Sequence, residues 1–144
     1  MAPLRTVMND EDAKEFMTEE QTVKSFRDMV VWNRSIDLCV AVYDFTRTFP
    51  SDELYGLRSQ LRRASVSISS NIAEGCGRRS TGELIQFVGM ARGSNFEVQT
   101  QLVIANKLNF GTQPGLTQCD HLSIEVTKML NAWMNSLIAK QLNR

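Results

Sequence analysis

The arginines between residues 58 and 79 are the side chains of this sequence best suited to chemistry. Arg58 and Arg62 are four residues apart, which places them on one face of a helix, and Arg63 lies beside them. Arg78 and Arg79 follow near the end of the same segment. Guanidinium groups stay charged and donate paired hydrogen bonds to phosphates and carboxylates. The arginines therefore predict either an anion or nucleic-acid surface, or ion pairs within the chain or between subunits.

The segment Gly-Cys-Gly-Arg-Arg-Ser, residues 75–80, raises the question of a phosphate-binding loop. Such a loop follows a strand and has the form G-x-x-x-x-G-K-S/T, and this segment lacks that spacing. It instead predicts a turn between two helices, with Gly75 and Gly77 at the end of the helix that precedes the turn. The serine-rich residues before it are predicted to be helical, with small side chains that let a neighbouring helix or subunit approach closely.

Catalytic and metal-binding patterns are weak in this sequence. His121 is the one histidine, and together with Cys119 it supplies at most two ligands, fewer than the roughly three or four of a zinc site. The sequence has no Glu-x-x-His pair and no nucleophile elbow. We therefore predict a surface position for His121, no metal, no cofactor and no enzymatic activity.

Charge and composition limit the other function classes. The 144 residues suit one domain, and the 16 basic and 16 acidic side chains give a formal net charge of zero. Any attraction for nucleic acid must therefore come from a local patch. The three cysteines lack pair spacing, which favours a reducing compartment, and we predict a cytoplasmic location. No apolar run reaches the roughly 18 to 20 residues of a membrane span, and the start does not resemble a signal peptide.

The pattern of apolar residues predicts an all-α fold, an antiparallel up-down-up-down four-helix bundle. Residues 1–25 are polar and acidic, and we expect a mobile N-terminal extension there, with the bundle over residues 26–144. The first helix is expected to stop at Pro50, the second to start at Ser51, the third to run from the Ser80 capping box to about Asn109, and the fourth to start near Thr117. The predicted turns lie near residues 49–51, 75–80 and 110–116.

The first helix carries two apolar stripes side by side. One consists of Trp32, Ile36, Cys39, Val40 and Tyr43, and the other of Val31, Leu38, Val42, Phe45 and Phe49. Two such faces indicate burial on two sides, inside a bundle or between subunits. With the small residues on helices two and three, they predict a homo-oligomer.

Glu74 lies at the small-residue end of the second helix. A carboxylate that is partly buried there needs a cationic partner, because an unpaired buried charge is costly. Arg62 and Arg78 are the candidate partners for a structural ion pair.

The stretch YGLRSQLRRASVSISSNIAEGCGRRS, residues 55–80, resembles the signature of the four-helix-bundle proteins encoded in 23S ribosomal RNA intervening sequences. The accessory variability protein of diversity-generating retroelements is related to that family. The resemblance covers about residues 26 to 140. It implies a ring-like, barrel-shaped homopentamer, and the retroelement relative implies partnership with a reverse transcriptase and nucleic-acid binding.

Two hypotheses about function follow. In the first, a non-enzymatic assembly gathers the basic side chains by symmetry and binds RNA, DNA or a nucleic-acid enzyme. In the second, the protein is an interaction scaffold in which salt bridges consume the same arginines.

Overall fold

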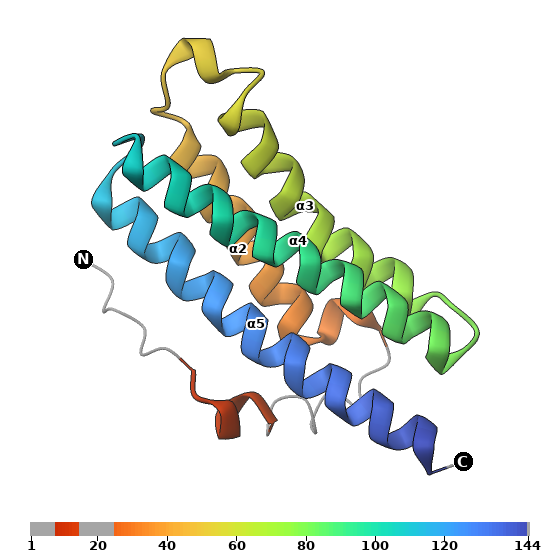
Figure 1. The fold of residues 1–144 in the computed structure, drawn as a ribbon. Coiled ribbons are helices and arrows are strands. Elements are labelled where there is room, and N and C mark those ends of the chain that lie inside the picture. Colours follow the sequence, from red (N-terminus) through yellow and green to blue (C-terminus); the bar gives the residue numbers. More distant parts are fainter. Residues whose placement is uncertain (1–7, 15–24, 144) are drawn as a thin grey trace.

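The computed structural model describes residues 8–14 and 25–143, and these residues form helices and connections without a strand (Figure 1). The described part of the chain is therefore all-helical. The long helices are α2 (Val30–Thr46), α3 (Leu57–Cys76), α4 (Thr81–Lys107) and α5 (Gln113–Leu142), and two short 3₁₀ turns are η1 (Phe26–Asp28) and η2 (Ser51–Glu53). Much of the predicted extension over residues 1–25 lies outside the described residues.

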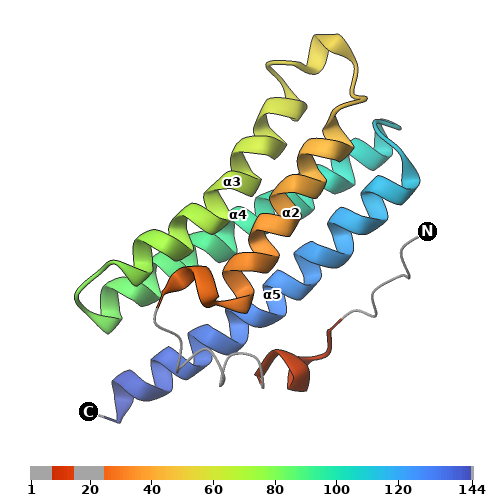
Figure 2. The same ribbon diagram turned by 180° about the vertical axis from the view of Figure 1, so that it is seen from behind.

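Successive long helices run in opposite directions and pack around one core (Figures 1 and 2). The packed pairs are α2 with α3, α3 with α4, α4 with α5, and α5 with α2. The largest fully buried side chains come from all four helices and include Leu38, Leu61, Ile68, Ile72, Leu102, Met129 and Leu130. Burial of these apolar groups is the main force that holds the four helices together.

The two apolar stripes of α2 have different surroundings. The stripe of Val31, Leu38, Val42 and Phe45 is buried in the core, together with Phe49 just beyond the end of α2. The other stripe remains partly open to solvent, with Val40 58% and Tyr43 40% exposed. One face of α2 thus builds the core, and its second apolar face lies on the surface of the single chain.

The serine-rich part of α3 is an unbroken helix, as predicted. Three of its polar side chains, Ser65, Ser69 and Asn71, donate to carbonyl groups one turn earlier in the same helix. Ser65 donates to the Arg62 carbonyl at 2.9 Å, and Asn71 donates to the Ser67 carbonyl at 2.8 Å. Short polar side chains satisfied in this way leave the apolar stripe free to decide the structure.

Small residues bring α3 and α4 close together. The Ser67 and Ser94 hydroxyls lie 2.9 Å apart across this contact. A Cβ atom built on Gly75 would lie 2.7 Å from the Phe87 Cβ. The prediction that Gly75 caps the helix is wrong, because it is a buried residue within α3. The cap is Gly77, which has a right-handed φ of −84°. The glycine at 75 is needed for a different reason, the close packing of α3 against α4.

The connection between α2 and α3 is longer than predicted (Figures 1 and 2). We predicted the first helix up to Pro50 and the second from Ser51, but α2 ends at Thr46 and α3 begins at Leu57. The acidic residues form the turn η2 instead, and Glu53 Oε2 accepts from the Leu57 backbone N–H at 2.8 Å. Glu53 thus caps α3 from outside rather than occupying its first turn.

The start of α5 also differs from the prediction. Thr112 is its N-cap, and the Thr112 hydroxyl accepts from the Gly115 N–H at 3.2 Å. The helix therefore begins at Gln113, before the predicted start near Thr117. Proline fits the first turn because the N–H it lacks has no partner there, so Pro114 helps to start α5. The predicted helix start at Ser80 is confirmed, since its hydroxyl accepts from the Glu83 N–H.

Residues 8–14 pack against the long helices. Met8 and Ala13 are buried in the same core as α2 to α5. The Lys128 ammonium on α5 donates to the Met8 carbonyl at 2.8 Å. Residues 8–14 therefore contribute to the core. The prediction of a mobile extension did not include this contact.

Candidate functional site

Three of the predicted arginines line an open groove on α3. The groove brings together Arg58 and Arg62, which are one helical turn apart, and Arg63, which follows Arg62 directly. The groove has a volume of about 460 Å³, and its remaining lining residues are Tyr43, Leu54, Ser59, Val66 and Ser67. We call this the arginine groove.

Contacts with α2 fix the guanidinium of Arg62. Its Nε donates to the Thr46 hydroxyl at 2.9 Å, and its Nη2 donates to the Tyr43 carbonyl at 3.3 Å. The guanidinium carbon also lies 4.4 Å from the centre of the Tyr43 ring, a cation–π geometry. These bonds use two N–H groups of a side chain that has five, so Arg62 is held in place with donors to spare.

The charge of the arginine groove is not neutralised within the described part of the chain. No carboxylate there lies within 4.0 Å of Arg58, Arg62 or Arg63. Burial, followed by the positive charge of Arg58, lowers the pKa of Arg62. The Arg58 Nε is buried and has no hydrogen-bond partner among the described residues. An anion in the groove would therefore relieve the repulsion between Arg58 and Arg62.

The other two predicted arginines lie at the opposite end of α3. Arg78 follows Arg62 by 16 residues, which is about 24 Å along a helix. Its guanidinium pairs with Glu74 at 2.8 Å and lies 4.6 Å from the centre of the Phe87 ring. Arg79 is exposed at the same end. The predicted set of five arginines is thus divided between two ends of one helix.

The predicted ion pair of Glu74 with an arginine is confirmed, but Arg62 is not the partner. Twelve residues of α3 separate the two, which is about 18 Å along the axis. Glu74 pairs with Arg78, the other candidate, across one turn. The Glu74 side chain is 55% exposed, so burial is not what demands this partner.

The sequence pattern did not indicate the aromatic and apolar side chains around the groove. Tyr43 was assigned to an apolar stripe, yet it stacks on Arg62. Leu54 and Val66 are 46% and 42% exposed at the groove, and Tyr55, next to Leu54, is 92% exposed. The signal available for Tyr55 was its place between turn residues, three positions before Arg58.

The outer face of α4 carries a second group of exposed apolar side chains. Its members, each at least 42% exposed, are Met90, Phe96, Val103 and Ile104. A shallow hollow on this face is lined by Gly93, Phe96, Glu97, Thr100 and Gln101. The Gln101 Oε1 atom is buried and lacks a hydrogen-bond partner in the described structure. We call the four apolar side chains the α4 patch.

Within residues 8–14 and 25–143, no three His, Cys, Asp or Glu side chains are arranged to hold a metal ion. Burial raises the pKa of the Cys119 thiol to about 12, so the thiol is protonated and a poor nucleophile near neutral pH. No helix in the described segments has the length and apolar character needed to cross a membrane.

The fold and groove define a small all-helical protein with an arginine-lined surface site. A model of the 23S rRNA-intervening sequence protein family matches residues 27–132, and the chain belongs to this family. The match includes α2, α3, α4 and the first two thirds of α5, and it confirms the family resemblance seen in the sequence. A comparison with curated proteins gives no significant match.

Proposed function

We propose that this chain is a non-enzymatic nucleic-acid-binding protein and that the arginine groove contacts the phosphate backbone. The observation that carries the proposal is the set of three adjacent arginines without an intramolecular counter-charge in the described residues. Lys and Arg contacts to phosphates release counterions and supply most of the affinity of sequence-independent binding. Such binding is weak, tolerant of sequence and strongly dependent on salt.

We further propose that the four long helices form an up-down-up-down bundle that assembles as a homo-oligomer. The exposed apolar stripe of α2 and the α4 patch support assembly, because they leave apolar surface for a partner to cover. The family resemblance favours a homopentamer. Because the net charge of one chain is zero, a symmetric ring would concentrate basic charge that a single copy lacks.

A scaffold without a nucleic-acid role is the alternative function. The hollow on α4 supports it, because Glu97 lies there beside Phe96 and could meet an arginine of a neighbouring copy. In that arrangement the groove arginines would form ion pairs across subunits and would not be available to bind a phosphate.

The proposal needs no catalytic group, metal or cofactor. Its partners are other copies of the chain, together with RNA, DNA or a protein that acts on nucleic acid, such as a reverse transcriptase. The buried, protonated Cys119 thiol suits a reducing compartment such as the cytoplasm.

Fluorescence anisotropy with labelled RNA and DNA at low salt tests the proposal. The wild-type chain should bind, and the variant Arg58→Gln/Arg62→Gln/Arg63→Gln should lose most of that binding while its helicity and assembly stay intact. Arg79→Gln is the matched control, because Arg79 is exposed in the turn after α3 and lies outside the groove. Absence of low-salt binding, together with a looser oligomer in the triple variant, would favour the scaffold.

A further inference from the structure

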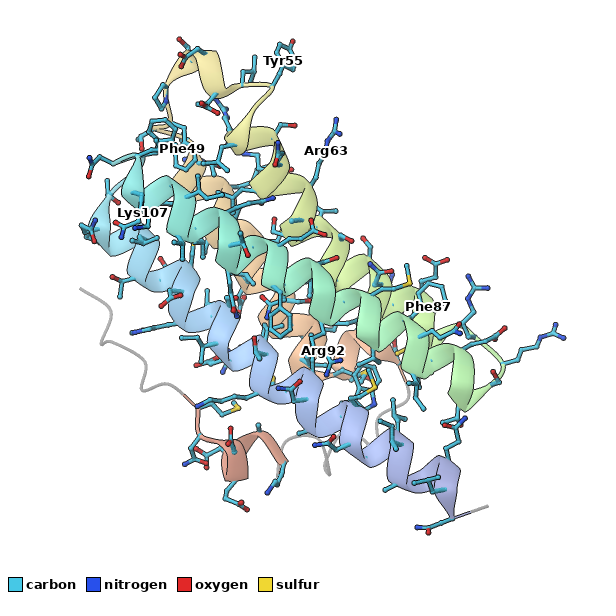
Figure 3. The ribbon with its side chains drawn as sticks, viewed as in Figure 1. Phe49, Tyr55, Arg63, Phe87, Arg92 and Lys107 are labelled. Atoms are coloured by element: carbon cyan, nitrogen blue, oxygen red, sulfur yellow. The ribbon has the colours of Figure 1, made fainter. Side chains whose placement is uncertain are left out.

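Tyr55 is an aromatic side chain presented almost entirely to solvent, and it follows Leu54, a residue that lines the arginine groove. It is 92% exposed, more than any of the other large apolar or aromatic side chains described. Figure 3 shows Tyr55 pointing away from the protein at the end of the molecule where Arg63 also points outward. Because so little of the Tyr55 side chain is buried, its ring is available to stack on a ligand.

The backbone around Tyr55 is held by hydrogen bonds. The Leu54 N–H donates to the Ser51 carbonyl at 3.3 Å, and the Gly56 N–H donates to the Glu53 carbonyl at 3.1 Å. The Glu53 carboxylate then caps Leu57, the first residue of α3. The ring is thus presented from a defined turn that leads directly into the helix bearing the arginines.

The groove beside Tyr55 has both charged and apolar walls. Leu54, the residue before Tyr55, lines the groove together with Arg58, four residues further along the chain. Val66 and the ring of Tyr43 supply apolar surface on the other sides. The volume, about 460 Å³, is that of a site for a group of small-molecule size. One nucleotide unit, with an anionic backbone and a flat base, matches this combination.

Aromatic side chains distinguish unpaired from paired nucleic acid. An unpaired base offers its face for stacking, whereas the bases of a duplex are already stacked on one another. We infer that the Tyr55 ring and the arginine groove form one binding surface for single-stranded nucleic acid, with the backbone over the arginines and an unpaired base on Tyr55. This inference rests on the proposed function and adds the class of ligand to it.

The test measures binding of the full chain to labelled probes of about 15 nucleotides, a length within the range of single-strand sites. The probes are a single-stranded RNA, the matching duplex, and an abasic strand with the same backbone charge. The variants are Tyr55→Ala, which removes the ring, and Tyr55→Phe, which keeps the ring and removes the hydroxyl. Light scattering on each variant reports the oligomeric state.

We expect Tyr55→Ala to weaken single-strand binding about fivefold or more, since stacking on an aromatic ring contributes at least that much. The same variant should bind the duplex and the abasic strand as the wild type does, and Tyr55→Phe should match the wild type on every probe. Single-strand binding that is unchanged in Tyr55→Ala would overturn the inference but leave the proposed function standing.

Two further results would also contradict the inference. A lower oligomeric mass in Tyr55→Ala would make Tyr55 a contact between copies of the chain. Wild-type protein that binds none of the probes at low salt would overturn the inference together with the proposed function.

Discussion

The buried carboxylate of Glu125 shows how strongly burial changes what one residue contributes. Its side chain is 5% exposed, and its Oε2 lies 3.1 Å from the Arg34 Nε between α5 and α2. Glu74, which is also paired with an arginine, is 55% exposed on α3. A buried ion whose partner is removed keeps its desolvation penalty, whereas an exposed ion returns to water.

Replacement of the arginine partners should therefore have very different effects on the free energy of unfolding. We expect Arg34→Met, which leaves Glu125 buried without its partner, to destabilise the protein by about 3 kcal/mol or more. Arg78→Met, the exposed control, should cost no more than about 1 kcal/mol. Urea denaturation of both variants measures the difference, and equal losses would contradict the structural role assigned to the Arg34–Glu125 pair.

The Cys119 thiol predicts a loss of stability at alkaline pH. Burial raises its pKa from 9.0 to about 12 in the folded protein, so the folded state holds this proton more tightly than the unfolded state. Its contribution is therefore fully present below about pH 9 and is lost progressively as the pH rises toward about 12. Cys119→Ala should show a shallower decline in unfolding free energy between pH 8 and pH 10, by about 1 kcal/mol. Identical pH slopes for wild type and variant would show that this thiol does not titrate as described.

At the scale of elements, the contact between α3 and α4 depends on one glycine. A Cβ on Gly75 would press on Phe87 at 2.7 Å and on the Leu84 side chain at 3.1 Å. A Cβ on Gly93 of α4, by contrast, would meet no neighbouring atom within 4 Å. The two glycines lie in helices, so they separate the effect of packing from the effect of helix propensity.

We expect Gly75→Ala to lower the unfolding free energy by about 1 to 3 kcal/mol, because α3 and α4 must move apart. Gly93→Ala should raise it by about 0.5 to 1 kcal/mol, because alanine is the better helix former. Thermal unfolding followed by circular dichroism compares the variants, and a stable Gly75→Ala protein would contradict the close packing.

The sequence predicts the elements better than it predicts their ends. Helical periodicity identified all four long helices, including the serine-rich part of α3. The start of α3 was misplaced because Ser51, Asp52 and Glu53 are residues typical of a first helical turn. In the structure the helix begins only after Gly56. The start of α5 was misplaced because Pro114 fell within the predicted turn over residues 110–116, although proline in a first turn is compatible with a helix.

The candidate site was only half predictable for a related reason. The i, i+4 spacing brings Arg58 and Arg62 together within one helix, and the sequence shows that directly. The contact of Arg62 with Thr46 and Tyr43 joins two helices, and no local pattern encodes such a pairing. Distance along α3 also separates Arg78 from the groove, which a list of basic residues does not reveal.

At the scale of the whole molecule, the exposed apolar surface predicts self-association. Light scattering should give a mass well above the 16.3 kDa of one chain. Phe96→Glu places a charge in the α4 patch and should shift the protein toward smaller species. Leu142→Glu is the control, because Leu142 is 79% exposed at the far end of α5. A stable monomer at micromolar concentration would rule out the assembly.

The salt dependence of nucleic-acid affinity tests the central claim most directly. For single strands, the slope of log K against log salt is about −0.7 for each neutralised phosphate. Wild-type protein should give a steep negative slope, and Arg58→Gln/Arg62→Gln/Arg63→Gln should make it shallower by about 2, the sum for three lost phosphate contacts. The same steep slope in wild type and triple variant would show that the phosphate contacts lie elsewhere and would contradict the arginine groove as the binding surface.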